Sequence, residues 1–271
     1  MNKKKLILLI VSLIILLLFA LLTRTPLWMA LIKSKSHFIE NNNNSRVLYE
    51  QGAEEASDKF AAFFTTAIRT IEDTHLNPFS KPFNVYVCNT QKSLGEFVAA
   101  KSLYPIRGLS LRGDVYTAPS AFNFKGLDTH RETLIHELAH LHFRTQLGFV
   151  KYRKIPSWFH EGFADYVSGA GGEGIEEQDA IDYILNSKHF IPNDESKVFG
   201  SFRRESKDLS GPMYHKQVKM FVTYLVETDS VNFSNLVIKI QDGESFSKSF
   251  NETLETDVQS KWTEFVAHLN E

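Results

Sequence analysis

Two short motifs stand close together in the middle of the chain: TLIHELAH at residues 133–140 and PSWFHEGFAD at residues 156–165. On a helix, H-E-x-x-H places His136 and His140 one turn apart on the same face, where both imidazoles can bind one metal ion. Zinc is the metal that this pattern predicts. Glu137 lies roughly 100° round the helix from His136, beside the ion rather than in its coordination sphere. That position suits a general base for a metal-activated water.

The second motif offers the third ligand that a catalytic zinc site needs, with a fourth position left open for water. Pro156 and Ser157 predict a helix start with Ser157 as N-cap, which places Glu161 in the first turns. Asp165 follows four residues later on the same face, where it can accept a hydrogen bond from a ligand imidazole and fix its tautomer. The sequence therefore predicts one zinc ion per chain, held by two histidines and Glu161.

The H-E-x-x-H pattern also occurs by chance in amphipathic helices, but the residues around the first motif favour a metal site. Apolar residues surround the motif on most sides, which predicts a buried helix. Burying three polar side chains without a metal or other partners would cost free energy. Two alternatives remain open: a zinc-binding pseudopeptidase that acts as a membrane-anchored binding module, and a metal-free binding module whose histidines are structural.

Together, HELAH and WFHEGFADY resemble the gluzincin metallopeptidases, the group that includes thermolysin and the zinc aminopeptidases, and more loosely the small peptidase-MA-like membrane proteins. In this resemblance the zinc ligands fall on His136, His140 and Glu161. The general base falls on Glu137, and the aspartate that orients a ligand histidine falls on Asp165. No G-x-M-E-N stretch occurs upstream, so nothing points to an aminopeptidase in particular.

The resemblance implies a zinc metallopeptidase that hydrolyses peptide bonds. Zinc would polarise the scissile carbonyl, and Glu137 would take a proton from the attacking water and deliver it to the leaving amine. Many gluzincins also place a Tyr or His to donate a hydrogen bond to the oxyanion. Tyr214, on the apolar face of a helix expected to begin at Gly211, is the candidate, with His215 as the substitute. Zincins commonly bind the substrate backbone on an edge strand, for which residues 113–119 are the candidate.

The pattern along the chain predicts an α+β protein with a zincin-like fold. A small N-terminal sheet subdomain at 36–128 is expected to pack on a mostly helical subdomain at 129–271 that carries the zinc site. The expected elements are helices at 47–74, 93–101, 130–148, from 157, from 211 and across 258–269, and strands at 83–88, 114–119 and 121–124.

Residues 1–35 differ in kind from the rest. Three lysines at 3–5 precede an uncharged run at 6–22, rich in Leu and Ile, at the short end of a transmembrane helix. A signal peptide is the alternative, but no A-x-A cleavage site precedes Thr23, which favours an uncleaved signal anchor. The positive residues before the run predict a single-pass protein of the cell membrane, with its N-terminus inside and the catalytic domain outside the cytoplasm.

Composition limits the partners. The net charge of -2 argues against nucleic acid as a partner. The resemblance to the gluzincins implies a peptide or protein substrate instead. The one cysteine, Cys88, excludes both an intrachain disulfide and a cysteine-based zinc site. The acidic stretch at 170–182 is expected to be a solvated face, although it would favour basic substrates if it bordered the cleft. His142 and His160 are expected to be hydrogen-bonding or surface residues rather than ligands.

Overall fold

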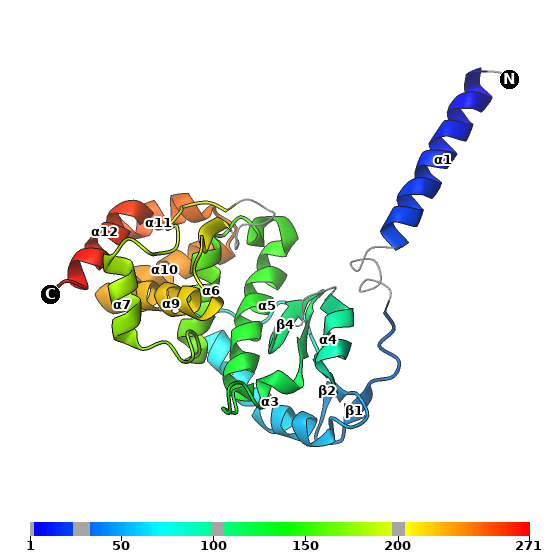
Figure 1. Ribbon diagram of the computed structural model, residues 1–271, viewed down its shortest axis with the longest axis horizontal. Helices are drawn as coiled ribbons and strands as arrows, with labels where there is room; N and C mark the ends of the chain where they lie inside the picture. Colours follow the sequence, from blue (N-terminus) through cyan, green and yellow to red (C-terminus); the bar gives the residue numbers. More distant parts are fainter. Residues whose placement is uncertain (1–2, 24–32, 99–105, 197–203) are drawn as a thin grey trace.

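The computed structural model describes residues 3–23, 33–98, 106–196 and 204–271. Within these ranges the protein is α+β and mostly helical (Figure 1). The strands are β1 (Ile39–Asn41), β2 (Asn44–Tyr49), β3 (Val85–Val87), β4 (Gly108–Leu111) and β5 (Asp114–Thr117). The helices are α1 (Lys3–Thr23), α3 (Glu54–His75), α4 (Gln91–Val98), α5 (His130–Tyr152), α6 (Ser157–Ser168), α7 (Glu177–Leu185), α9 (Gly211–Thr228), α10 (Ser230–Gln241), α11 (Phe246–Leu254) and α12 (Val258–His268).

The sheet is mixed and has the strand order β1-β2-β3-β5-β4. Its centre is parallel, because β2 pairs with β3 and β3 pairs with β5 in the same direction. Both outer pairs are antiparallel, and a tight turn joins β4 to β5. In that turn Arg112 and Gly113 both have positive φ (54° and 86°), as a two-residue hairpin turn requires. The edge strand nearest the metal motif is therefore β4.

This topology corrects the expected substrate strand at 113–119. Residues 114–117 of that stretch form β5, which lies inside the sheet between β3 and β4, so its backbone groups are already paired. The sequence pattern missed β4 because Gly-Leu-Ser-Leu contains no β-branched or aromatic residue.

Two further element predictions are wrong in part. The helix expected at 47–74 begins only at Glu54, because Val47 belongs to β2 and the chain turns at Gly52 (φ 92°). No strand forms at 121–124: Ala121 ends a 3₁₀-helix, η1 (Pro119–Ala121), and Phe124 forms only an isolated antiparallel bridge with Leu127. The predicted end of the short helix, at Lys101, lies outside the described residues, as do residues 24–32.

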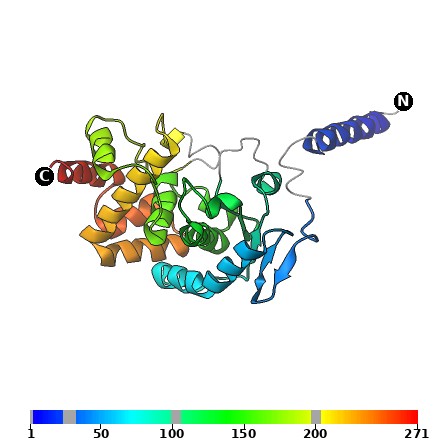
Figure 2. The ribbon, with the colours of Figure 1, turned by 60° about the horizontal axis from the view of Figure 1, so that its bottom comes forward.

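The helix α5 lies between the sheet and the C-terminal helices (Figure 2). One of the two largest apolar clusters lies on each side of it. On one side it packs against α3 and the sheet, and on the other against α6 and the C-terminal helices. The core on the sheet side includes Val47, Phe60, Phe64, Ile71, Val85, Val115, Leu134 and Leu138. The helical core includes Phe143, Trp158, Phe159, Phe163, Phe190, Phe221, Phe250 and Trp262. A helix buried from both sides holds its polar motif in a fixed place.

The helices α6 and α9 pack unusually closely, and Gly162 explains why. A Cβ atom at this position would lie 2.6 Å from the carbonyl oxygen of Val218 on α9. The glycine of the second sequence motif is therefore a packing requirement, which brings α9 within reach of the site on α5 and α6.

The predicted transmembrane helix is wrong, and with it the predicted single-pass location and orientation at the cell membrane. Among the described residues, no helix is long and apolar enough to cross a membrane. The helix α1 begins with three lysines, and the uncharged run that follows has 17 residues. At about 1.5 Å per residue this run extends roughly 26 Å, short of a hydrocarbon core of about 30 Å. In Figure 1, α1 stands apart from the other elements.

Candidate metal centre

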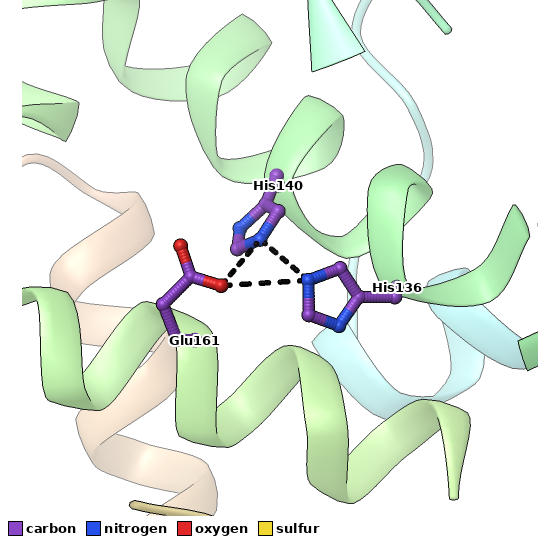
Figure 3. A group of neighbouring side chains, drawn as sticks. All are labelled: His136, His140 and Glu161. Atoms are coloured by element: carbon purple, nitrogen blue, oxygen red, sulfur yellow. Dashed lines mark hydrogen bonds and ion pairs between the residues drawn. The ribbon is translucent and has the colours of Figure 1, made fainter. Parts of the chain in front are cut away.

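The three predicted ligand side chains meet between α5 and α6 (Figure 3). The Nε2 atoms of His136 and His140 lie 3.1 Å apart. Oε2 of Glu161 lies 3.4 Å from Nε2 of His136 and 3.3 Å from Nε2 of His140. The described residues therefore bring together a His2Glu group that is close enough to bind a metal ion.

The spacing of these atoms fits a tetrahedral ion. Zinc binds imidazole nitrogen and carboxylate oxygen at about 2.0–2.1 Å, and two ligands at tetrahedral positions are then about 3.3–3.4 Å apart. The three observed separations run from 3.1 to 3.4 Å. Two imidazoles and one carboxylate also form a donor set of the kind found in zinc sites with an open fourth position.

Asp165 holds the orientation of His136. Its side chain is fully buried, and Oδ1 lies 2.9 Å from Nδ1 of His136, which directs Nε2 of that ring towards the other ligands. Its second oxygen, Oδ2, lies 2.7 Å from Nδ1 of His215 on α9. Burial alone would raise the pKa of Asp165, but the neighbouring charges of His215 and His136 lower it to about 2. Asp165 thus stays ionised and connects three helices.

The ligand Glu161 is also kept ionised by its surroundings. Burial would raise the pKa of its carboxyl, but the charge of His140 and hydrogen bonds from both ligand histidines lower that pKa well below its usual range. A deprotonated carboxylate is the form that a metal ion binds.

The structure adds one orienting residue that the sequence did not reveal. The hydroxyl of Tyr152 is buried and lies 3.2 Å from Nδ1 of His140. Tyr152 reaches this position because Gly148 (φ 71°, ψ 171°) interrupts α5 and turns its last residues back towards the motif. The sequence predicted a stop at Gly148, but the direction of the chain after a glycine cannot be predicted from local pattern.

Glu137 lies against the edge strand β4. Its Oε2 accepts a hydrogen bond of 2.7 Å from the backbone N–H of Ser110. The approach is close, since a Cβ atom at Gly108 would lie 2.9 Å from Cγ of Glu137. The carbonyl of Ser110 accepts a hydrogen bond from Arg144. Ser110 therefore uses both of its backbone groups to hold side chains of α5.

The two candidates for stabilising an oxyanion differ in position. Tyr214 is fully buried in the helical core, with its ring edge-on to Phe190, and does not line the cavity at the metal centre. His215 lines the cavity, and its ring centre lies 6.1 Å from that of His136. Adjacent residues on a helix point about 100° apart, so the apolar stripe that buries Tyr214 leaves His215 facing the site.

A cavity of about 640 Å³ opens in front of the three ligands. His142 has its predicted hydrogen-bonding role: it is buried, with Nε2 3.0 Å from the carbonyl oxygen of Asn77. His160 lines the cavity with Nδ1 3.5 Å from Oε1 of Glu161, and it is not part of the His2Glu group. Burial lowers the pKa of His160 to about 3, so this ring is neutral near pH 7. Besides the ligands, the polar lining includes Arg107, Ser110, Thr133, Glu137, Arg144, Tyr152, Arg153, Ser157, His160, Glu173 and His215.

Comparison with known proteins gives no relative: no family model matches the chain, and no curated protein matches its sequence. The function of this protein is therefore inferred from the chemistry of this site.

Proposed function

We propose that this chain is a zinc-dependent peptidase of the gluzincin type. The observation that carries the proposal is the triangle of His136, His140 and Glu161, with sides of 3.1 to 3.4 Å, at the wall of a cavity that also holds Glu137 and His215. A zinc ion bound there would supply a Lewis acid for the scissile carbonyl and an activated water.

Glu137 is the general base of the proposed reaction. It takes a proton from the attacking water and returns it to the leaving amine. The hydrogen bond from Ser110 to Oε2 fixes one carboxylate oxygen, which leaves Oε1 for this exchange.

His215 is the proposed donor to the developing oxyanion. Its Nδ1 faces Asp165, so Nε2 is the nitrogen that can donate to substrate. Burial would lower the pKa of His215, but the Asp165 carboxylate outweighs it and raises that pKa, which favours a charged donor.

Hydrolysis of a quenched fluorescent peptide library by the purified full chain tests this proposal. Glu137→Gln should retain zinc and lose at least about a hundredfold in turnover, as expected on removal of a general base. Glu132→Gln is the matched control, because Glu132 lies on the same helix but does not line the cavity. Hydrolysis that survives Glu137→Gln would refute the assigned role. A zinc-loaded wild type with no hydrolytic activity would support the pseudopeptidase alternative.

A further inference from the structure

Two arginines line the cavity beyond the ligand His140. Arg144 lies one helical turn after His140, about 6 Å along the axis, on the face that also carries His136. Arg153 follows the break in α5 at Gly148 and lines the same cavity. Both side chains are partly buried.

Within the described part of the chain, neither arginine has a carboxylate partner. Arg144 donates to the carbonyl of Ser110 and lies 5.0 Å from the ring centre of Tyr152, and Arg153 lies 5.4 Å from that of Phe149. No Asp or Glu of the described residues forms an ion pair with Arg144 or Arg153, and the undescribed segments contain no Asp or Glu in their sequence. Two partly buried guanidinium groups thus stand in the cavity without a counter-charge, which is costly unless a ligand supplies one.

A third arginine that lines the cavity differs from these two because it is paired with a carboxylate. Arg107 pairs with Glu173 at 2.7 Å, so its charge is neutralised within the protein. The charges of Glu137 and Glu161 face the metal centre, where a divalent ion would offset them. When a divalent ion is bound at the metal centre, the positive charges that stay unbalanced in the cavity are therefore those of Arg144 and Arg153.

The acidic stretch near α7 does not reverse this balance. Of the stretch at 170–182, Ala170 and Glu173 line the cavity, and the charge of Glu173 is offset by Arg107. Glu176, Glu177 and Asp179 are exposed and do not line the cavity, so they add no negative charge to its wall.

We infer that Arg144 and Arg153 form a subsite for a carboxylate of the substrate. The inference rests on the proposed peptidase function. The planar guanidinium group binds carboxylates through paired, charge-assisted hydrogen bonds. The rise of about 6 Å along α5 from His140 to Arg144 equals about two residues of extended peptide at about 3.3 Å each, so we expect this carboxylate within about two residues of the cleaved bond. It belongs either to an Asp or Glu side chain or to the C-terminus of the substrate.

Cleavage of four matched peptides by the zinc-loaded full chain distinguishes these sources. The peptides carry Glu or Gln within two residues of the cleaved bond, each with a free or an amidated C-terminus. A carboxylate should raise kcat/KM about ten- to hundredfold, the usual effect of hydrogen bonds to a charged group. A Glu-over-Gln preference assigns the subsite to an acidic side chain, and a free-acid preference assigns it to the substrate C-terminus. Equal cleavage of all four peptides would overturn the inference and leave the peptidase function standing.

A variant comparison links the preference to its residues. Arg153→Gln should bring the ratio of kcat/KM for the acidic and neutral peptides down towards one, and Arg153→Glu should invert it. Arg131→Gln is the matched control, since Arg131 lies on α5, stacks on Phe63 at 5.3 Å and does not line the cavity. An unchanged ratio in folded Arg153→Gln would overturn the assignment. If that variant does not fold, the ratio of kcat/KM for the acidic and neutral peptides is measured on the wild type at increasing salt concentration instead. A ratio that does not fall with salt would overturn the assignment to the arginines.

A binding measurement separates this inference from the proposed function. Fluorescence anisotropy reports the Kd of the same peptides for zinc-loaded Glu137→Gln, which is expected not to cleave them. If the acidic peptides bind more tightly than the neutral ones, and Arg153→Gln abolishes this difference, the subsite is supported. This holds even if the wild type cleaves no peptide, a result that would refute only the peptidase function. Equal Kd values for acidic and neutral peptides would overturn the subsite.

Discussion

Replacing Asp165 with Asn tests how the protein holds its ligands without touching a ligand. The carboxylate of Asp165 faces the Nδ1 atoms of both His136 and His215, at 2.9 and 2.7 Å. An amide of the same shape has one oxygen, so it can accept from only one of these nitrogens. The change therefore removes the negative charge and one of two acceptors, in a place that is fully buried.

The expected loss follows from these contacts. Removing the partner that orients a ligand histidine typically lowers metal affinity about 10- to 100-fold, or about 1.4–2.7 kcal/mol. Turnover should also fall at saturating zinc, because His215 loses the carboxylate that favours its charged form. Competition with a chromogenic chelator measures the zinc Kd, and peptide hydrolysis at saturating zinc measures kcat separately.

A control and a contradicting result complete this test. Asp179→Asn makes the same chemical change at an exposed position of α7, away from the cavity, and should leave both quantities at their wild-type values. Wild-type zinc affinity in a folded Asp165→Asn variant would refute the orienting role of Asp165.

Four further substitutions test other parts of the site. Gly108→Ala places a Cβ atom 2.9 Å from Cγ of Glu137, so the side chain of the base must move. We expect about a hundredfold lower kcat with unchanged zinc content, and a wild-type kcat would contradict the position of Glu137 against β4. Tyr152→Phe removes the hydrogen bond to a ligand imidazole and should weaken zinc binding about tenfold in the chelator assay. His215→Gln should lower kcat about a hundredfold, whereas Tyr214→Phe should change it only a few-fold; the opposite order would restore the tyrosine as the donor.

The ligand group could be predicted because helical spacing is local. A separation of four residues places His136 and His140 on one face, and the same rule relates Glu161 to Asp165. The meeting of α5 and α6 was inferred only from the short connection between the two motifs. The structure brings the three ligand side chains together at that junction.

Residues that depend on long-range geometry could not be predicted. Tyr152 reaches His140 only through the turn at Gly148, and Ser110 reaches Glu137 only because β4 forms the edge of the sheet. The position of Tyr214 away from the cavity could not be predicted for a similar reason, because the apolar stripe shows which residues face the core but not where the site lies.

The fold prediction succeeded and failed for related reasons. The α+β composition and the strands around Val85 and Val115 follow from local pattern. The predicted transmembrane helix depended on length, and the run at residues 6–22 is shorter than a bilayer core requires. The helix predicted from Val47 merged a strand with a helix, because apolar residues spaced for one structure can also fit the other.

Zinc content per chain, measured by elemental analysis on the purified full-length wild type and His140→Ala, tests the central claim most directly. The ligand triangle predicts about one zinc per wild-type chain and a clear loss in the variant, because two protein ligands hold the ion far less well than three. A folded wild type that binds no zinc when the metal is supplied, or a variant that binds as much as the wild type, would contradict the proposed metal centre.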